Sequence, residues 1–315
     1  MIIKREKKGG VDVYYVDKNI PDDKMDSYKN TKVKESEIDL ILKKDSDVYK
    51  VDKEDPSGFS LLLRFRKNKL SEKNTKDFYE NVIDFALRTT ANRGSTSGSK
   101  SKNIYDNPRV MSNILGYFDK LSPIQKMKMR EQGKKLNITV RETRFNMDYP
   151  EKYKKLTPLI EELDSFYEEY IPEKYEKQYK KAKQTPFRIT NTSFTTVTTN
   201  VNFQTTIHKD KGDDEEGFGN LVVIEDGKYT GGETCFPQYG VGVDVRTGDV
   251  LFMDVHEWHG NLPIKKENDN VKRLSIVCYL RYNVWKNTKG KTKKFMDMHN
   301  NKIRNLRSKD KTRKR

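Results

Sequence analysis

The carboxyl half of the chain contains five short runs rich in β-branched and aromatic residues: FTTVTTNVNF (194–203), LVVI (221–224), VGVDV (241–245), DVLFMDV (249–255) and RLSIVCYLR (273–281). Runs of this composition are typical of β-strands. Glycines separate several of them, and no helical pattern lies between them. Strands that follow one another without helices predict an antiparallel sandwich or jelly roll, with helices from the amino half covering one sheet.

The amino half shows helical patterns instead. Residues 77–87 carry apolar side chains at helical spacing. A helix start is expected at residues 122–125, where Ser and Pro precede Gln, and another at Thr157 and Pro158, before an apolar face over residues 159–170. The Gly/Ser stretch at 92–101 has the composition of a flexible linker.

We expect three segments along the chain. Residues 1–70 are charged, with LLLRF (61–65) as the one strand-like run, and they predict a poorly defined amino-terminal lobe. Residues 71–285 form the main domain, whose β core covers about 188–285. Residues 286–315 contain thirteen Lys or Arg and two Asp. Such a block predicts a basic flexible tail that binds the phosphate backbone, although a solubilising tail or a nuclear address would have the same composition.

Composition excludes several other classes of protein. Of 315 residues, 33% are hydrophobic and 35% are charged, and the net charge is +16. No apolar run reaches the roughly 18 residues of a membrane span, and the first ten residues lack the apolar stretch of a signal peptide. We therefore expect an intracellular protein, nuclear if the host is eukaryotic. Cys235 and Cys278 are isolated, which predicts no disulfide partner and no zinc knuckle.

Three polar residues in the β region form a candidate iron site. His208 and Asp210 are two positions apart at the end of a strand-like run, so both side chains lie on one face. His259 follows another predicted strand and could supply a third ligand. Two histidines and one carboxylate bind non-haem Fe(II) and leave three positions for O2 and a co-substrate.

His256 is a rival for the third ligand. It lies three residues before His259 in the segment HEWHGN. We prefer His259, because it lies past the strand and beside the Gly-Asn turn, where the chain must bend around a metal. His256 is then expected to be a hydrogen-bond partner of the ligands.

Arg273 begins the next predicted strand, and Ser275 faces the same way two residues later. A buried guanidinium beside an iron site suits a carboxylate, which it can hold through two parallel hydrogen bonds. The residues therefore predict a dicarboxylic co-substrate. Each residue also has a purely structural interpretation, with Arg273 paired to an acid and His259 in an ordinary loop.

The stretch 194–281 resembles the oxygenase domain shared by the J-binding-protein thymine hydroxylases and the TET methylcytosine oxidases, and it is more similar to the thymine side. The resemblance implies a double-stranded β-helix (cupin-like) core, Fe(II), 2-oxoglutarate and O2, with ascorbate as a stimulant. It implies hydroxylation of the 5-methyl group of thymine or 5-methylcytosine in DNA, on a flipped or single-stranded base. By the same resemblance His208, Asp210 and His259 hold iron, and Arg273 and Ser275 bind the distal carboxylate of 2-oxoglutarate.

The base-contacting positions of the TET pattern correspond here to Asp213, Tyr279 and Arg281. Tyr279 matches that pattern, whereas Asp213 and Arg281 depart from it and are similar to the thymine hydroxylases. An ionised Asp only accepts hydrogen bonds and an Arg only donates them, so the pair could contact a base edge without excluding methylcytosine. By similarity to base-repair oxygenases, Asn200 and Asn202 are candidates for the other end of 2-oxoglutarate.

Two alternative functions remain. The GGET segment at 231–234 and the His-x-Asp order also occur in proteins that resemble prolyl hydroxylases, although those usually carry Lys in place of Arg273. The GGET glycines fit either a close approach of the backbone to a cavity or plain turns. A non-catalytic DNA-binding relative is the other alternative, and no segment here corresponds to a domain for glucosylated DNA.

Overall fold

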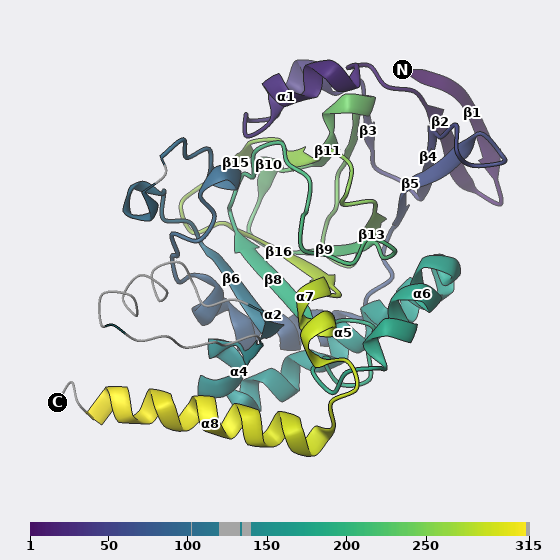
Figure 1. Ribbon diagram of the computed structural model, residues 1–315. Helices are drawn as coiled ribbons and strands as arrows, with labels where there is room; N and C mark the ends of the chain where they lie inside the picture. Colours follow the sequence, from purple (N-terminus) through teal and green to yellow (C-terminus); the bar gives the residue numbers. More distant parts are fainter. Residues whose placement is uncertain (102, 120–132, 134–139, 313–315) are drawn as a thin grey trace. The chain divides into compact units, whose positions relative to one another are not determined.

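The computed structural model describes residues 1–101, 103–119, 133 and 140–312 (Figure 1). The chain forms two compact units that interleave along the sequence. Unit 1 comprises residues 1–113, 199–211 and 218–277, and unit 2 comprises residues 114–198, 212–217 and 278–315. The helix start expected at 122–125 lies outside the described residues. Within the described ranges, no helix has the length and apolar character that crossing a bilayer requires.

Unit 1 is built on two β-sheets with a shared core. The larger sheet has the strand order β1 (Ile2–Lys8), β2 (Val11–Val16), β4 (Ser46–Val51), β5 (Phe59–Arg66), β13 (Val250–Met253), β9 (Gly219–Asp226), β16 (Lys272–Tyr279) and β8 (Thr196–Val201). The smaller sheet has the order β14 (Gly260–Asn261), β11 (Thr234–Phe236), β12 (Val241–Val243) and β3 (Leu40–Leu42). One buried cluster contains Leu63 and Leu251 from the larger sheet and Phe236 and Val241 from the smaller. The sheets therefore face each other, as the jelly-roll prediction requires.

The amino-terminal residues are part of both sheets. Strand β5 pairs antiparallel with β13, from Arg66 opposite Val250 to Leu63 opposite Met253. Strand β3 pairs in parallel with β12 of the smaller sheet. The sequence indicated only residues 61–65 as a strand, because β1 is mostly charged and exposed, and β2 and β4 are short runs interrupted by charged residues.

Unit 1 also contains short helices and one long helix. They are η1 (Asp22–Lys24), α1 (Met25–Tyr28), η2 (Glu35–Glu37), α2 (Glu72–Ala86), η3 (Ser95–Ser97), η4 (Ile104–Asp106) and η5 (Pro237–Tyr239), and strands β10 (Tyr229–Gly231) and β15 (Ile264–Lys266) pair beside them. Helix α2 begins five residues before the predicted 77–87, because Ser71 caps it by accepting a hydrogen bond from the Asn74 backbone.

Unit 2 continues β8 and β16 and adds β6 (Ser112–Phe118) and β7 (Arg141–Glu142). Its helices are α4 (Arg144–Asp148), α5 (Pro150–Tyr170), α6 (Pro172–Ala182), α7 (Tyr282–Thr288) and α8 (Lys293–Thr312). The predicted helix start at Thr157 is wrong, because α5 already begins at Pro150. Pro158 is tolerated inside the helix, since the Thr157 hydroxyl donates to the Lys154 carbonyl that a proline cannot serve.

Residues 293–312 form helix α8, where the composition predicted a flexible tail. Phe295 contacts the Phe187 ring edge-on, with the ring centroids 6.4 Å apart. The His299 ring nitrogen Nε2 lies 2.6 Å from the Val140 carbonyl oxygen, and Ile303 is buried. These three residues are spaced four apart, so they form one helical face that packs onto unit 2. The high charge of the segment led to the prediction of a flexible tail, because it outweighs these few packing residues in the composition.

Candidate metal centre

His208, Asp210 and His259 come together in unit 1. One ligand atom from each lies within 4.8 Å of the other two, and among the described residues no other such group of His, Cys, Asp and Glu occurs. The Nε2 atoms of His208 and His259 lie 3.6 and 3.8 Å from the two Asp210 carboxylate oxygens. Three donors converging in this way are suited to one divalent transition-metal ion.

The backbone fixes the spacing of the three residues. The backbone N–H groups of His208 and His259 each donate to the other residue's carbonyl at 2.9 Å. The Asp210 N–H donates to the Val255 carbonyl, also at 2.9 Å. The segment after β8 is thereby joined to the segment after β13, which places the predicted third ligand beside the first two.

Hydrogen bonds also orient the two imidazole rings. The His208 Nδ1 lies 2.7 Å from the Thr206 carbonyl, and the His259 Nδ1 lies 2.9 Å from the Glu257 carbonyl. Because a carbonyl only accepts, each Nδ1 must be the protonated nitrogen, which leaves a lone pair on Nε2 facing Asp210. Burial, reinforced by His259, lowers the pKa of His208 to about 4, so its ring is neutral at physiological pH.

His256 does not belong to this cluster. Its backbone N–H donates to Asp254 Oδ1 at 3.1 Å, which tightens the turn that leads to His259. The spacing argument that favoured His259 over His256 as the third ligand is thus consistent with the geometry.

Arg273 is buried in the same unit. The residue is 4% exposed. Among the described residues, its guanidinium forms no ion pair, and its Nε has no hydrogen-bond partner. Burial lowers the pKa of this guanidinium. A buried cation without a counter-ion is costly. A buried guanidinium with an unused donor is able to bind a carboxylate.

Gly232 and Tyr229 lie close to the Arg273 side chain. A Cβ added to Gly232 would lie 2.9 Å from Arg273 Nε, so the GGET segment approaches the guanidinium closely, as one of its two interpretations predicted. The Tyr229 hydroxyl is also buried without a hydrogen-bond partner, and it interacts electrostatically with Arg273. Sequence analysis missed Tyr229, because a tyrosine on a short strand carries no spacing signal.

Asn200 and Ser275 lie in one hydrogen-bonded chain. The Asn200 Nδ2 lies 3.5 Å from Ser275 Oγ, and its Oδ1 accepts from Ser112 Oγ at 2.6 Å. Arg93 Nε in turn donates to Ser112 at 2.8 Å, and its charge contributes to the lowered pKa of His208. Arg93 lies in the stretch predicted to be a linker, and no motif marked it as a site residue.

Asn202 has a different role from the one considered for it. Its side-chain oxygen accepts from the Arg273 backbone N–H at 2.8 Å, and its own N–H donates to the Arg273 carbonyl at 3.0 Å. The residue adopts a positive φ of 48°. Its amide is therefore committed to the backbone of β16, where it sets the position of Arg273.

The predicted base-contacting residues lie together in unit 2. Asp213 and Arg281 face each other in an antiparallel β-bridge. The Arg281 guanidinium lies 4.7 Å from the Phe118 ring centroid, and its Nε donates to Asp119 at 2.9 Å. A Cβ at Gly212 would overlap this guanidinium, so a larger residue there would have to displace Arg281. Tyr279 is buried, with its hydroxyl 3.3 Å from Thr198 Oγ1.

A lysine anchors the loop that carries Asp213. Lys181 of α6 contacts the carboxylates of Asp214 at 2.5 Å and Glu216 at 2.6 Å. The Asp214 backbone N–H also donates to the Leu280 carbonyl at 3.0 Å. The loop at 212–217 is thus fixed to unit 2 by both charge and backbone hydrogen bonds.

Comparisons with known proteins identify similar oxygenases. A model of the Tet_JBP family, described as the oxygenase domain of the 2OGFeDO superfamily, matches residues 127–282. The chain is 30% identical over 202 residues to the thymine dioxygenase JBP1 of Trypanosoma brucei brucei, covering 64% of this chain and 22% of that protein. It is 32% identical over 201 residues to the bifunctional helicase and thymine dioxygenase JBP2 of Trypanosoma cruzi, covering 64% of this chain and 17% of that protein.

A solved structure shares the fold. NgTET1 in complex with 5mC DNA aligns with a TM-score of 0.50 and 14% identity, covering 90% of this chain and 89% of that one. The double-stranded β-helix prediction is thereby confirmed. The chain spans about a fifth of the length of the curated relatives described above. Residues 127–282 are thus similar to the Tet_JBP oxygenase domain of the 2OGFeDO superfamily.

Proposed function

We propose that the chain is an Fe(II)- and 2-oxoglutarate-dependent dioxygenase that hydroxylates the 5-methyl group of thymine in DNA, giving 5-hydroxymethyluracil, or the same group of 5-methylcytosine. The observation that carries this proposal is the convergence of His208, Asp210 and His259. The buried, unpaired Arg273 supports a carboxylate co-substrate. The thymine substrate rests on the names of the similar proteins.

The three ligands would hold iron from one side. Their Nε2 and carboxylate atoms already face one another, and the Nδ1 hydrogen bonds prevent the rings from turning away. When bound, iron(II) supplies the activation of O2 that is coupled to oxidation of 2-oxoglutarate. Because His208 is neutral above a pKa of about 4, it needs to lose no proton to bind the metal near pH 7.

Arg273 and Ser275 would bind the distal carboxylate of 2-oxoglutarate. The orphaned Arg273 Nε and the unpaired Tyr229 hydroxyl can both donate to an oxygen placed between them. Asn200 is hydrogen-bonded to Ser275 and would contact the co-substrate on its other side. Asn202 holds the Arg273 backbone, which keeps the guanidinium aimed in one direction.

Asp213, Tyr279 and Arg281 would contact the target base. Arg281 is stacked on Phe118 and tethered to Asp119 through Nε, which leaves its terminal nitrogens to donate to a base carbonyl. The thymine methyl lies in the major groove, so a flipped or single-stranded base is needed to bring it into an enclosed site.

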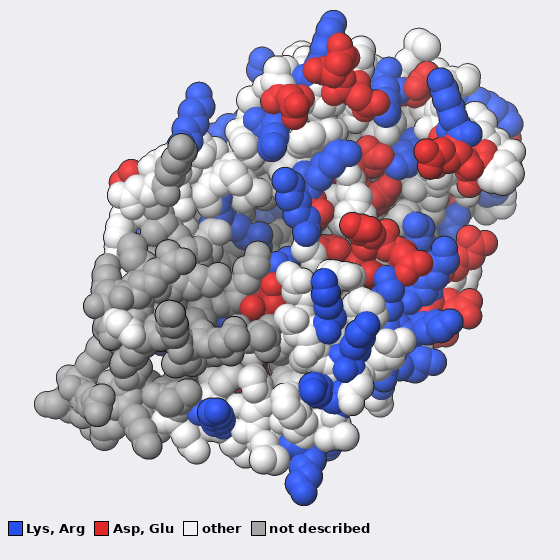
Figure 2. Space-filling view, viewed as in Figure 1, with Lys and Arg blue, Asp and Glu red and all other residues white. Residues whose placement is uncertain are grey.

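The basic carboxyl-terminal segment would add affinity for the DNA backbone. Helix α8 carries Lys293, Lys294, Lys302 and Arg304 against Asp297. Figure 2 shows Lys and Arg side chains along the lower part of the face in view, where Figure 1 places the beginning of α8. Contacts of this kind depend on salt and carry no sequence information. In a eukaryotic host the enzyme would act in the nucleus, and ascorbate would stimulate it.

Mass spectrometry of nucleosides tests the function directly. Thymine-rich and methylcytosine-containing DNA would be incubated with the protein, Fe(II), ascorbate and 2-oxoglutarate, beside a His259→Ala control. We expect 5-hydroxymethyluracil with the parent protein alone. Appearance of 5-hydroxymethylcytosine instead would assign the cytosine substrate. Succinate without a modified base would point to another substrate, and a prolyl peptide would be tested next. Absence of both succinate and a modified base would contradict the proposed catalysis.

A further inference from the structure

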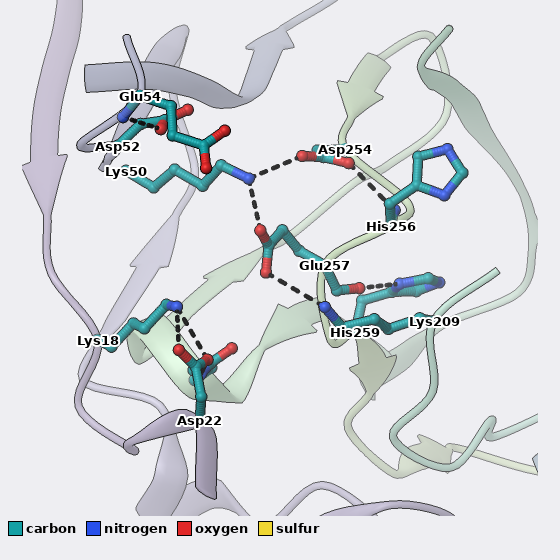
Figure 3. A network of polar contacts seen from close by, with 11 residues as sticks. Lys18, Asp22, Lys50, Asp52, Glu54, Lys209, Asp254, His256, Glu257 and His259 are labelled. Carbon is teal, nitrogen blue, oxygen red and sulfur yellow. Dashed lines mark hydrogen bonds and ion pairs between the residues drawn. The ribbon is translucent and has the colours of Figure 1, made fainter. Parts of the chain in front are cut away.

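Lys50 occupies the centre of a sheltered ionic cluster at the turn that leads to His259 (Figure 3). Its ammonium group, on strand β4, contacts Asp254 Oδ2 at 2.9 Å and Glu257 Oε1 at 2.5 Å. The three side chains are only 14%, 18% and 16% exposed. Lys50 lies 204 residues from Asp254 along the chain and outside the residues that match the oxygenase family. We call Lys50, Asp254 and Glu257 the Lys50 cluster.

Glu257 connects this cluster to both ligand segments. Its carbonyl oxygen is the acceptor that fixes His259 Nδ1 at 2.9 Å. Its second carboxylate oxygen lies 4.0 Å from Lys209 Nζ, and Lys209 is the residue between His208 and Asp210. A displacement of Glu257 would therefore disturb the orientation of one ligand and the neighbours of the other two.

Asp254 fixes the beginning of the same turn. Its Oδ1 accepts from the His256 backbone at 3.1 Å, and its backbone N–H donates to the Leu62 carbonyl of β5 at 2.9 Å. The Glu257 N–H donates back to the Asp254 carbonyl at 3.2 Å. The turn from residue 254 to 259 is thus held at both ends, and Lys50 is the cation that both of its carboxylates share.

Removal of the Lys50 charge would leave two sheltered carboxylates facing each other. Burial alone would lower the pKa of Lys50, but the two carboxylates outweigh it and raise that pKa, so the lysine stays charged. Without it, Asp254 and Glu257 would repel each other and draw in water. Glu257 would then turn toward solvent, and loss of this anchor would loosen the backbone turn that presents its carbonyl to His259.

We propose that Lys50 is a positioning residue for the metal centre, acting through Glu257 on the orientation of His259. The inference rests on the proposed metal-binding function, but it does not depend on the identity of the substrate. It gives the amino-terminal strands a role in the site, in addition to their place in the sheet.

The test is Co(II) binding by the metal-free full-length chain, followed by the d–d absorption bands that report ligand geometry. Lys50→Met is compared with Lys67→Met, which breaks a similar ion pair between an amino-terminal lysine and the fully buried Asp249, at 2.7 Å. We expect Lys50→Met to weaken Co(II) binding by roughly 10-fold, the lower end for loss of a group that orients a metal ligand, and to shift the bands. Lys50→Arg should restore both.

Urea unfolding of each variant separates this role from plain loss of stability. Lys67→Met should lower the free energy of unfolding while leaving Co(II) affinity and the bands unchanged. If Lys50→Met fails to fold, Glu257→Gln removes one carboxylate charge at constant size, and it should shift the bands in the same way. Unchanged bands and affinity in the folded Lys50 or Glu257 variants would overturn the proposal.

The two proposals fail in different ways. Co(II) binding with the predicted variant pattern, but no oxidised base in any DNA, would sink the proposed substrate and leave the role of Lys50 intact. Absence of Co(II) binding by the parent chain would remove both.

Discussion

Two lysines in this molecule bridge a pair of carboxylates beside a candidate site, and their surroundings differ. In unit 1, Lys50 joins Asp254 and Glu257, which are 18% and 16% exposed. In unit 2, Lys181 joins Asp214, which is 1% exposed, and Glu216, which is 48% exposed. Water screens the charge of Glu216, whereas both carboxylates of the Lys50 cluster are largely shielded from water. The metal side of the molecule therefore depends on two sheltered ion pairs, whereas the predicted base side depends on one.

The largest expected effect concerns the candidate metal ligands, which lie next to the Lys50 cluster. Asp210→Ala should abolish metal binding and lower turnover on the order of 10³-fold or more, because two imidazoles alone hold Fe(II) poorly. His256→Ala, in the same turn but outside the donor group, should retain metal binding. Co(II) titration and succinate release measure both. Equal losses in the two variants would contradict the assignment of the ligands.

The second prediction concerns Lys181. Lys181→Met leaves the buried Asp214 carboxylate without its cation, and we expect the free energy of unfolding to fall by about 3 kcal/mol, the lower end for a broken buried pair. Glu216→Gln should change it by less than about 1 kcal/mol, because Glu216 is half exposed. Urea unfolding at pH 7 compares them. Similar losses of unfolding free energy in both variants would show that the ion pairs of Lys181 with Asp214 and with Glu216 are equally shielded from water.

The third prediction concerns Asp164 of α5, a buried carboxyl group that is held by hydrogen bonds and not by a lysine. It accepts from the Ser193 N–H at 2.9 Å and hydroxyl at 2.6 Å and from Tyr175 Oη at 3.3 Å. Burial raises its pKa to about 6, and those hydrogen bonds only partly offset the shift. Since the folded state then holds the proton more tightly than the unfolded state, this group stabilises the fold below pH 4 and that contribution is lost as pH rises through 6.

Between pH 4 and pH 6, the free energy of unfolding of the parent protein should fall by roughly 2 kcal/mol through Asp164. This value is somewhat less than the full free-energy equivalent of the pKa shift. The fall should be absent from Asp164→Asn, which does not titrate. Urea unfolding across this pH range, taken as the difference between the two proteins, measures it. A difference that does not change with pH would mean that Asp164 has an ordinary pKa.

The smallest expected effect concerns the base side. Arg281→Leu should lower kcat/KM for DNA about tenfold, the value of one charge-assisted hydrogen bond, while Co(II) and 2-oxoglutarate affinities stay unchanged. Asp119→Asn keeps the guanidinium but weakens its tether, so its loss should be smaller. Steady-state kinetics on DNA, with separate ligand titrations, test this. A change in metal affinity in Arg281→Leu would contradict the separation of the two roles.

Sequence patterns predicted the local features of this molecule well. The i, i+2 spacing of His208 and Asp210, and the place of His259 after a β-branched run, grouped three residues that the structure brings together. The strand predictions at 221–224 and 249–255 agree with β9 and β13. Each of these inferences depends on residues a few positions apart, where strand geometry alone fixes the neighbours.

The features that were missed depend on long-range contacts. Lys50 reaches Asp254 because β5 pairs with β4 on one side and with β13 on the other, so that residues 204 positions apart come together. Arg93 lies in a Gly/Ser stretch whose composition suggests flexibility, yet Ser112 binds it. Helix α8 was concealed because three apolar or aromatic residues are enough to dock it against unit 2. Composition averages over such residues and cannot single them out.

The pairing of β5 with β13 bears on how a minimal fragment of this protein is chosen. Similarity to the oxygenase family begins at residue 127, so a fragment cut there would retain β13 but lose the strand that lies beside it. The N–H and C=O groups of residues 250–253 that face β5 would then form an open sheet edge, directly before the turn that carries His259. Open edges of this kind recruit strands from other molecules. A boundary drawn from family similarity alone would thus turn an internal strand into an aggregation site.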